Sequence, residues 1–344
     1  KSDKPRDVAE SEAKEFIQVI EDASSYMFGY NHSIAYCLIG YICAWLRYYH
    51  TGEFVATYLN CAANKGDITD GTALAQEYGI RISPPRFGFS KDVYVYDKEN
   101  KVISKGIASV KYMNNAISNE LYSLKDKNYT HFMDLLLDIE NNTSVNSRQL
   151  DLLIKIDYFM QFGNCVELLR INEMFNFFKN GTAKSIKKDK IKSEVLENII
   201  SEHATDKKKD GSESKSYTIT DMHGLLIACE DYIKSLNLKD LSYKLKCANQ
   251  QEILGYIDLT TNREEDRRKL LVIKIVPLNN KDTGIPWGYA LFTKSVGSGK
   301  TSRLTLKSKL FDNKPIRNMD IIYANRIDKN QSGYWYLWDY DYVI

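Results

Sequence analysis

The chain has 344 residues, of which 43% are hydrophobic and 27% charged, so it is long and apolar enough for two or three folded domains. Its 47 Lys and Arg residues are nearly balanced by 45 Asp and Glu residues, which leaves a net charge of +2. A nucleic-acid surface would therefore have to come from local clustering of basic residues, because the overall charge favours no polyanionic partner.

The six cysteines form no C-x-x-C pair, which is typical of reduced thiols in a cytoplasmic protein. The five histidines have no metal-ligand spacing, so we predict no metal site and no bound cofactor. The longest apolar stretch, residues 35–46, is broken by tyrosines and a glycine and is followed by Arg47. It predicts a buried helix, and we expect neither a membrane span nor a signal peptide.

Helical and strand patterns alternate in the first half of the chain. Apolar residues recur at helical spacing over residues 10–64, which predicts packed helices. Within residues 79–103 the alternating run 93–96 and a turn at 98–100 predict a small strand pair. Helical periodicity then returns over residues 107–178.

Residues 179–215 contain an Asn-Gly turn signal, a lysine cluster and a Gly-Ser pair, with one short amphipathic stretch at 195–200. This composition predicts a mobile connector. A helix capped by Thr220 or Asp221 is expected to follow and to run through Ile233.

From Ile253 onward the pattern is that of short strands. The β-branched and aromatic runs occupy residues 254–259, 270–276, 288–292, 303–310, 320–323 and 334–343. This density predicts a small closed barrel, with the OB-fold as one candidate and a β-sandwich as the alternative. The predicted fold class is α+β, with helices followed by an OB-like barrel.

A glycine turn and several polar residues precede the apolar helix. Residues 26–36 read Tyr-Met-Phe-Gly-Tyr-Asn-His-Ser-Ile-Ala-Tyr. Such a turn can deliver Asn, His and Ser to a helix N-terminus, whose free N–H groups suit a phosphate. The alternative is that Asn31 or Ser33 only caps the helix and His32 is a satisfied polar residue, and residue types alone favour this alternative.

This run, with Trp-Leu-Arg at 45–47 and Glu-Phe at 53–54, resembles the fingers-domain signature of bacterial DNA polymerase III alpha subunits, the class C polymerases. Further segments similar to elements of that family follow in the same order: Gly79–Pro85, Lys105–Lys111, Asn146–Phe159 with Gly163, and Glu252–Tyr256. Ordered elements of this kind are more specific than a lone short motif.

The resemblance implies four regions: part of a fingers domain with a small strand pair over residues 1–105, a helix-hairpin-helix DNA-binding region over 106–178, a basic flexible connector and helix over 179–248, and an OB-like barrel over 249–344. It also implies a parent DNA-directed DNA polymerase that uses Mg²⁺, dNTPs and template-primer DNA.

In that family the aspartates that hold the metal ions lie upstream of the fingers signature, and this chain begins just before the signature. We therefore expect no catalytic residue here and no polymerase activity from the chain alone. Asp339 and Asp341 are interpreted as a solvated acidic pair.

The resemblance also implies contact residues. Nucleotide or DNA contacts in the fingers are Asn31, His32, Ser33, Tyr36 and Arg47. Hairpin contacts to DNA are Gly106, Lys111, Asn114 and Arg148. Two departures stand out: the family's Lys-Ser before its histidine has no counterpart, and its Gly-Val-Gly hairpin is Tyr-Met-Asn here, which predicts a weakened hairpin.

In the predicted barrel, Ser298–Thr301 ends like a P-loop, but Lys294 stands at the position of the first glycine and strands flank the segment. It is interpreted as a hairpin turn with a basic loop made by Lys294, Lys300 and Arg303.

Strand alternation near the carboxy terminus places Trp335 and Leu337 on one face and Tyr334, Tyr336 and Trp338 on the other. Single-strand contacts are predicted at Lys300, Arg303, Tyr334 and Tyr336. Packing of this face against the helical part is the alternative.

Two rival hypotheses remain at this stage. One is a stand-alone DNA-binding protein derived from the polymerase family, and the other is a structural module that contacts other replication proteins. No sliding-clamp peptide is recognised in the sequence.

Overall fold

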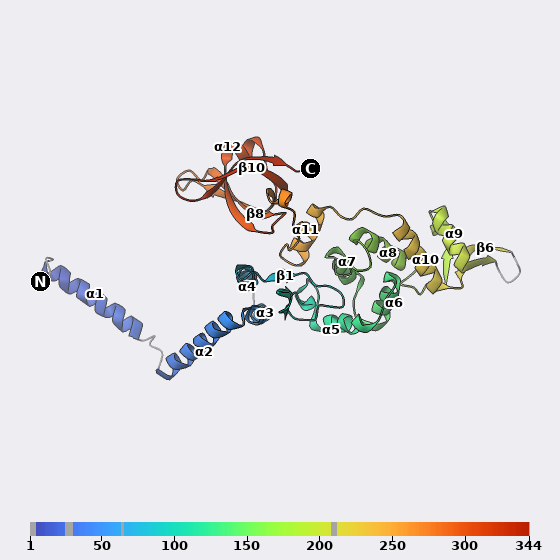
Figure 1. The fold of residues 1–344 in the computed structure, drawn as a ribbon, viewed down its shortest axis with the longest axis horizontal. Helices are drawn as coiled ribbons and strands as arrows, with labels where there is room; N and C mark the ends of the chain where they lie inside the picture. Colours follow the sequence, from blue (N-terminus) through green and yellow to red (C-terminus); the bar gives the residue numbers. More distant parts are fainter. Residues whose placement is uncertain (1–4, 25–29, 63–64, 208–211, 344) are drawn as a thin grey trace. The chain divides into compact units, whose positions relative to one another are not determined.

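The computed structural model describes residues 5–24, 30–62, 65–207 and 212–343 (Figure 1). The chain divides into two compact units, Lys1–Gly79 and Ile80–Ile344. The first is helical, whereas the second combines helices with two small sheets and a closed barrel. The α+β class predicted from the sequence is confirmed.

The first unit contains, in chain order, α1 (Arg6–Ser24), α2 (Tyr30–Tyr49), α3 (Thr51–Cys61) and α4 (Lys65–Glu77). Residues 35–46 lie within α2, and the prediction of a buried helix is wrong: Leu38, Ile42 and Trp45 are 57%, 53% and 44% exposed. The described elements of this unit leave that face uncovered. None of the described helices is both long and apolar enough to cross a membrane.

The second unit begins with a three-stranded sheet. The predicted strand pair is present as β2 (Val95–Asp97) and β3 (Val102–Ser104), which are antiparallel, and β1 (Arg81–Ser83) adds in parallel to β3. The helical elements that follow are η1 (Ile107–Ser109), α5 (Asn115–Ser123), η2 (Leu124–Asp126), α6 (Phe132–Asn142), α7 (Ser147–Lys155) and α8 (Cys165–Phe177).

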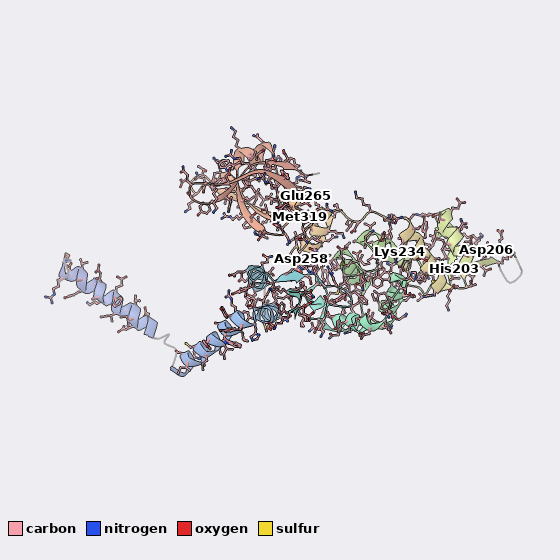
Figure 2. The ribbon with its side chains drawn as sticks, viewed as in Figure 1. His203, Asp206, Lys234, Asp258, Glu265 and Met319 are labelled. Atoms are coloured by element: carbon pink, nitrogen blue, oxygen red, sulfur yellow. The ribbon has the colours of Figure 1, made fainter. Side chains whose placement is uncertain are left out.

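A continuous apolar core joins these helices to α10 (Met222–Ser235). The predicted cap Asp221 accepts a hydrogen bond from Gly224 N at 2.9 Å. The buried Glu230 carboxylate of α10 accepts hydrogen bonds from the backbone N–H groups of Phe132 at 2.9 Å and Met133 at 2.7 Å. Lys234, labelled in Figure 2, pairs with it at 2.7 Å. Glu230 therefore caps α6 from a distant helix.

The predicted mobile connector instead contains regular structure. It forms β4 (Ser185–Lys187), η3 (Lys188–Lys190), α9 (Glu194–His203), β5 (Ala204–Lys207) and β6 (Glu213–Ile219), with strand order β4-β6-β5. This segment forms regular structure because Ile186 of β4, Ile200 of α9 and Tyr217 of β6 are buried in the main core. Lys188 pairs with Asp206 at 2.8 Å, and Asp206 lies near His203 in Figure 2. Residues 208–209 of the lysine cluster lie outside the described residues.

The barrel follows α11 (Tyr243–Ile253) and η4 (Glu264–Asp266). Its elements are β7 (Lys269–Asn279), β8 (Pro286–Ser295), β9 (Thr301–Lys307), α12 (Ser308–Asn313), β10 (Ile321–Lys329) and β11 (Trp335–Tyr342). The closed strand order is β10-β11-β9-β8-β7, drawn in orange to red in Figure 1. Five strands closed in this way form an OB-like barrel, so the β-sandwich alternative is excluded.

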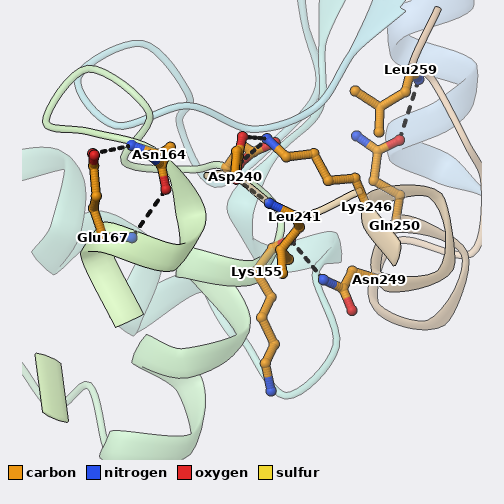
Figure 3. A network of polar contacts seen from close by, with 10 residues as sticks. Lys155, Asn164, Glu167, Asp240, Leu241, Lys246, Asn249, Gln250 and Leu259 are labelled. Atoms are coloured by element: carbon orange, nitrogen blue, oxygen red, sulfur yellow. Dashed lines mark hydrogen bonds and ion pairs between the residues drawn. The ribbon is translucent and has the colours of Figure 1, made fainter. Parts of the chain in front are cut away.

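The predicted strand at residues 254–259 is wrong. The backbone N–H and C=O groups of this segment form hydrogen bonds with side chains and not with a neighbouring strand. Lys105 Nζ donates to Leu254 O at 2.8 Å, and Lys294 Nζ donates to Ile257 O. Gln250 Oε1 accepts from Asp258 N at 2.9 Å, and it also contacts Leu259 N (Figure 3). Lys294 is 5% exposed, so it is part of this buried contact with residues 254–259 and not of a basic loop.

Candidate nucleic-acid interface

The segment predicted to be a fingers signature lies at the start of α2. His32, Ser33 and Tyr36 occupy its first turns, and the rings of His32 and Tyr36 have centroids 4.5 Å apart. Residues 25–29, with the predicted glycine turn, and the Asn31 side chain lie outside what the structure describes. The structure therefore does not test the predicted phosphate cradle.

Arg47 lies in the last turn of α2. At 1.5 Å per residue, about 22 Å of helix separates it from His32. Arg47 lines a cleft of about 420 Å³ with Phe54, Tyr58 and Asp70. The helix thus places the predicted fingers residues at opposite ends, and they do not form one cluster along it.

The predicted DNA-binding hairpin keeps a left-handed turn without glycine. Tyr112 has φ +66°, a conformation that disfavours a side chain, and its ring is 48% exposed. The Arg148 guanidinium lies 4.0 Å and Lys111 Nζ 5.3 Å from the Tyr112 ring centroid. Gln149 Nε2 donates to Tyr112 O at 2.7 Å, which stabilises the turn. The same backbone conformation recurs at Asp157, whose φ is +61°.

The other predicted hairpin residues have structural roles. Asn114 caps α5 by accepting a hydrogen bond from Ile117 N at 2.9 Å. A Cβ on Gly106 would lie 2.2 Å from Asp92 O, so the glycine permits a close approach of two backbone segments. Lys111 Nζ lies 3.9 Å from Glu252. The hairpin therefore uses most of its polar groups within the protein.

A second set of predicted residues lies on the outer face of the barrel. Cross-strand register pairs Phe292 of β8 with Lys274 of β7 on one side and with Arg303 of β9 on the other. The alternate residues Leu291 and Leu304 point into the barrel core. An exposed aromatic ring therefore stands between two cations on a strand face that OB-folds use for oligonucleotides.

The same face continues onto β11. Tyr336 pairs with Thr305 in parallel register, and its ring stacks on Trp338 with a centroid distance of 5.4 Å and an interplanar angle of 22°. Lys307 Nζ lies 5.2 Å from the Trp338 ring centroid. Leu337 is buried, so the predicted alternation of faces is confirmed for residues 336–338. We call this set the barrel stripe: Lys274, Phe292, Arg303, Lys307, Tyr336 and Trp338.

The remaining predicted barrel residues lie outside the strands. Lys300 is exposed in the predicted turn between β8 and β9, and Tyr334 is 61% exposed just before β11. Sequence reasoning missed Lys274, Phe292 and Lys307. Strand alternation could have found Phe292 and Lys307, but their neighbours on adjacent strands depend on register, which the sequence does not display.

Burial shifts the pKa values of two lysines and one aspartate in the second unit. Burial lowers the pKa of Lys105 to about 8, and it also lowers the pKa of Lys294. Burial raises the pKa of Asp258, while the charges of Lys294, Arg81 and Arg86 oppose that shift. Asp258 is labelled in Figure 2.

The described residues do not form a metal centre. Among them no group of three or more His, Cys, Asp or Glu side chains could hold an ion. Asp339 and Asp341 already accept hydrogen bonds from Asn325 Nδ2 at 3.1 Å and 2.9 Å, and Lys314 lies 3.4 Å from Asp341. These donors hold the pKa of Asp341 below its ordinary value. The pair therefore does not fit a two-metal site.

The OB-like barrel is a fold that nucleic-acid-binding proteins use. Part of the chain is similar to curated DNA polymerase III alpha subunits. It is 26% identical over 164 residues to the protein of Ureaplasma parvum, which covers 47% of this chain and 17% of that protein. It is 28% identical over 157 residues to the protein of Campylobacter jejuni, covering 44% and 13%, respectively.

A longer match is to the alpha subunit of Buchnera aphidicola subsp. Acyrthosiphon pisum, 24% identical over 249 residues, or 69% of this chain and 18% of that protein. The matched region thus spans less than a fifth of each of these relatives. No family model matches the chain. The chain therefore contains a region related to DNA polymerase III alpha subunits.

Proposed function

We propose that the chain is a DNA-contacting part of a replicative DNA polymerase of the polymerase III alpha type. The observation that carries the proposal is the barrel stripe, where aromatic rings alternate with exposed cations across four neighbouring strands. Stacking on such rings tolerates any base, and the cations follow the backbone charge. The similarity to polymerase III alpha subunits supports DNA as the ligand.

In this proposal the barrel stripe holds single-stranded template, and residues 106–178 contact duplex through a helix-hairpin-helix. The fingers residues of α2 would contribute to the dNTP pocket of an assembled polymerase. The Mg²⁺-binding carboxylates would come from another part of that polymerase, because the described residues do not fit them. Other replication proteins are expected partners of the assembled enzyme.

The test is a fluorescence-anisotropy titration of the full chain with labelled oligo(dT) and with a duplex of equal length. We expect salt-dependent binding of both, with Lys111→Glu weakening only the duplex and lowering the slope of log affinity against log salt by about 1. Affinity for neither DNA would contradict the proposal and favour a protein-interaction module. Tight binding unaffected by salt would also contradict it.

A further inference from the structure

A polar cleft of about 190 Å³ lies on the small sheet, and none of the predicted fingers, hairpin or barrel residues described above lines it. Parallel register pairs Arg81 with Val102 and Ser83 with Ser104, so these side chains share one face. Ile82 and Ile103, which alternate with them, are buried on the other face. The sheet thus separates an apolar side from a face of hydroxyl and guanidinium groups.

The cleft has an excess of positive charge. Arg81 and Arg86 both line it, and neither guanidinium makes an ion pair or side-chain hydrogen bond with another described residue. The carboxylate that lines the cleft, Asp97, is occupied by its own turn. It accepts hydrogen bonds from Asn100 Nδ2 at 2.7 Å and from Glu99 N at 3.0 Å. The two guanidiniums also lie near the buried Asp258, since their charges oppose the rise in its pKa, but Asp258 does not line the cleft. Two guanidiniums without a side-chain hydrogen bond therefore line the cleft beside one carboxylate that is already bonded, which favours an anionic ligand.

An exposed aromatic ring lies at the same cleft. Phe89 lines it and is 76% exposed. Its loop is rigid, because Ser90 Oγ accepts from Arg86 N at 2.9 Å and Ser90 N donates to Arg86 O at 3.0 Å. Phe87 fixes the loop to the core: it is 3% exposed, and its N–H donates to Tyr158 O at 2.9 Å. The backbone that carries Arg86 and Phe89 is thus fixed before any ligand binds, which lowers the entropic cost of binding.

We infer that this cleft binds one phosphorylated nucleotide unit, with the phosphate on Arg81 and Arg86 and the base stacked on Phe89. Guanidinium groups suit phosphate oxygens, the Ser83 and Ser104 hydroxyls can donate to the same oxygens, and an aromatic face accepts any base. The unit can come from the 5′ end of a strand or from a free nucleotide. The inference does not depend on the barrel stripe.

The test compares binding of a 3′-labelled dT₄ with and without a 5′-phosphate to the full chain. We expect the phosphate to raise affinity roughly tenfold, the equivalent of one charge-assisted contact. The double variant Arg81→Gln, Arg86→Gln should abolish that difference. Phe89→Ala, at an exposed position that folding does not need, should weaken both oligonucleotides. Lys98→Gln is the matched control, because Lys98 is exposed on the neighbouring turn and does not line the cleft.

Competition identifies the source of the ligand. If dTMP displaces the phosphorylated oligonucleotide, the site takes free nucleotides, and if only unlabelled phosphorylated dT₄ does so, it takes strand ends. No effect of the 5′-phosphate on the wild-type chain would overturn the inference, as would an equal loss in Lys98→Gln. A barrel variant such as Trp338→Ala should keep the phosphate effect, so failure of the cleft and failure of the proposed barrel function are separable.

Discussion

The predicted hairpin around Tyr112 and the outer face of the barrel carry similar residues but use them differently. In the hairpin, Arg148 lies on the ring of Tyr112 and Lys111 approaches Glu252. On the barrel, Lys274 and Arg303 flank Phe292 and have no ion-pair partner among the described residues. Groups already bonded within the protein must give up those contacts to bind a ligand, so the comparison predicts that the barrel contributes more to DNA affinity.

Internal use of cations is strongest at Lys246 of α11. It pairs with Asp157 at 2.9 Å and also with Asp240 (Figure 3). Lys246→Met should cost about 3 kcal/mol of unfolding free energy, because it leaves two partly buried carboxylates together. The control on the same helix is Lys244→Met, whose exposed pair with Asp320 should contribute under about 1 kcal/mol. Urea denaturation measures both, and equal losses would contradict an internal role for Lys246.

The pH dependence of stability tests whether Lys105 is also a cation used inside the protein. Its folded pKa of about 8 lies below the unfolded value of 10.5, so between these values the unfolded chain binds the extra proton. Stability of the wild type relative to Lys105→Met should therefore rise as pH increases from 8 to 10.5, by at most roughly 3 kcal/mol. Using the difference between the two proteins cancels the titration of tyrosines and cysteines. If the stability difference between the two proteins does not change from pH 8 to 10.5, folding does not lower the pKa of Lys105.

On the barrel, Trp338→Ala should weaken binding of oligo(dT) by about 1–3 kcal/mol, or roughly 5- to 150-fold, because it removes one stacking ring of the barrel stripe. Trp335→Ala is the matched control: Trp335 is on the same strand and 48% exposed, but it alternates with Trp338. Fluorescence titration at fixed salt compares the two. If Trp335→Ala loses as much affinity, the barrel stripe is not the binding face.

The contrast also explains what the sequence could predict. Short strands and turns are local patterns, so the barrel and the strand pair of β2 and β3 were predicted. A cap at Thr220 or Asp221 was also predicted, and Asp221 is the cap. The prediction of a mobile connector was wrong because Ile200 and Tyr217 pack against core residues that are distant in the sequence. Residues 254–259 have a strand-like composition, but Lys105 and Lys294 from distant segments bond their carbonyls. Only part of the barrel stripe was predicted, because strand register decides which residues of separate strands become neighbours, and the sequence does not show that register.

The smallest expected effect is at the hairpin. Tyr112→Gly should leave unfolding free energy within about 1 kcal/mol of the wild type, because relief of the left-handed strain offsets the lost ring contacts and the greater freedom of the unfolded chain. Tyr122→Gly, within α5, has no such strain to relieve and should cost about 1 kcal/mol or more. If the hairpin meets DNA through its backbone, Tyr112→Gly should also raise duplex affinity a few-fold, since the Cβ no longer blocks the approach of a phosphate. A fall in duplex affinity would show instead that the Tyr112 ring itself contacts the DNA, and the hairpin would then resemble the barrel stripe in its use of aromatic residues.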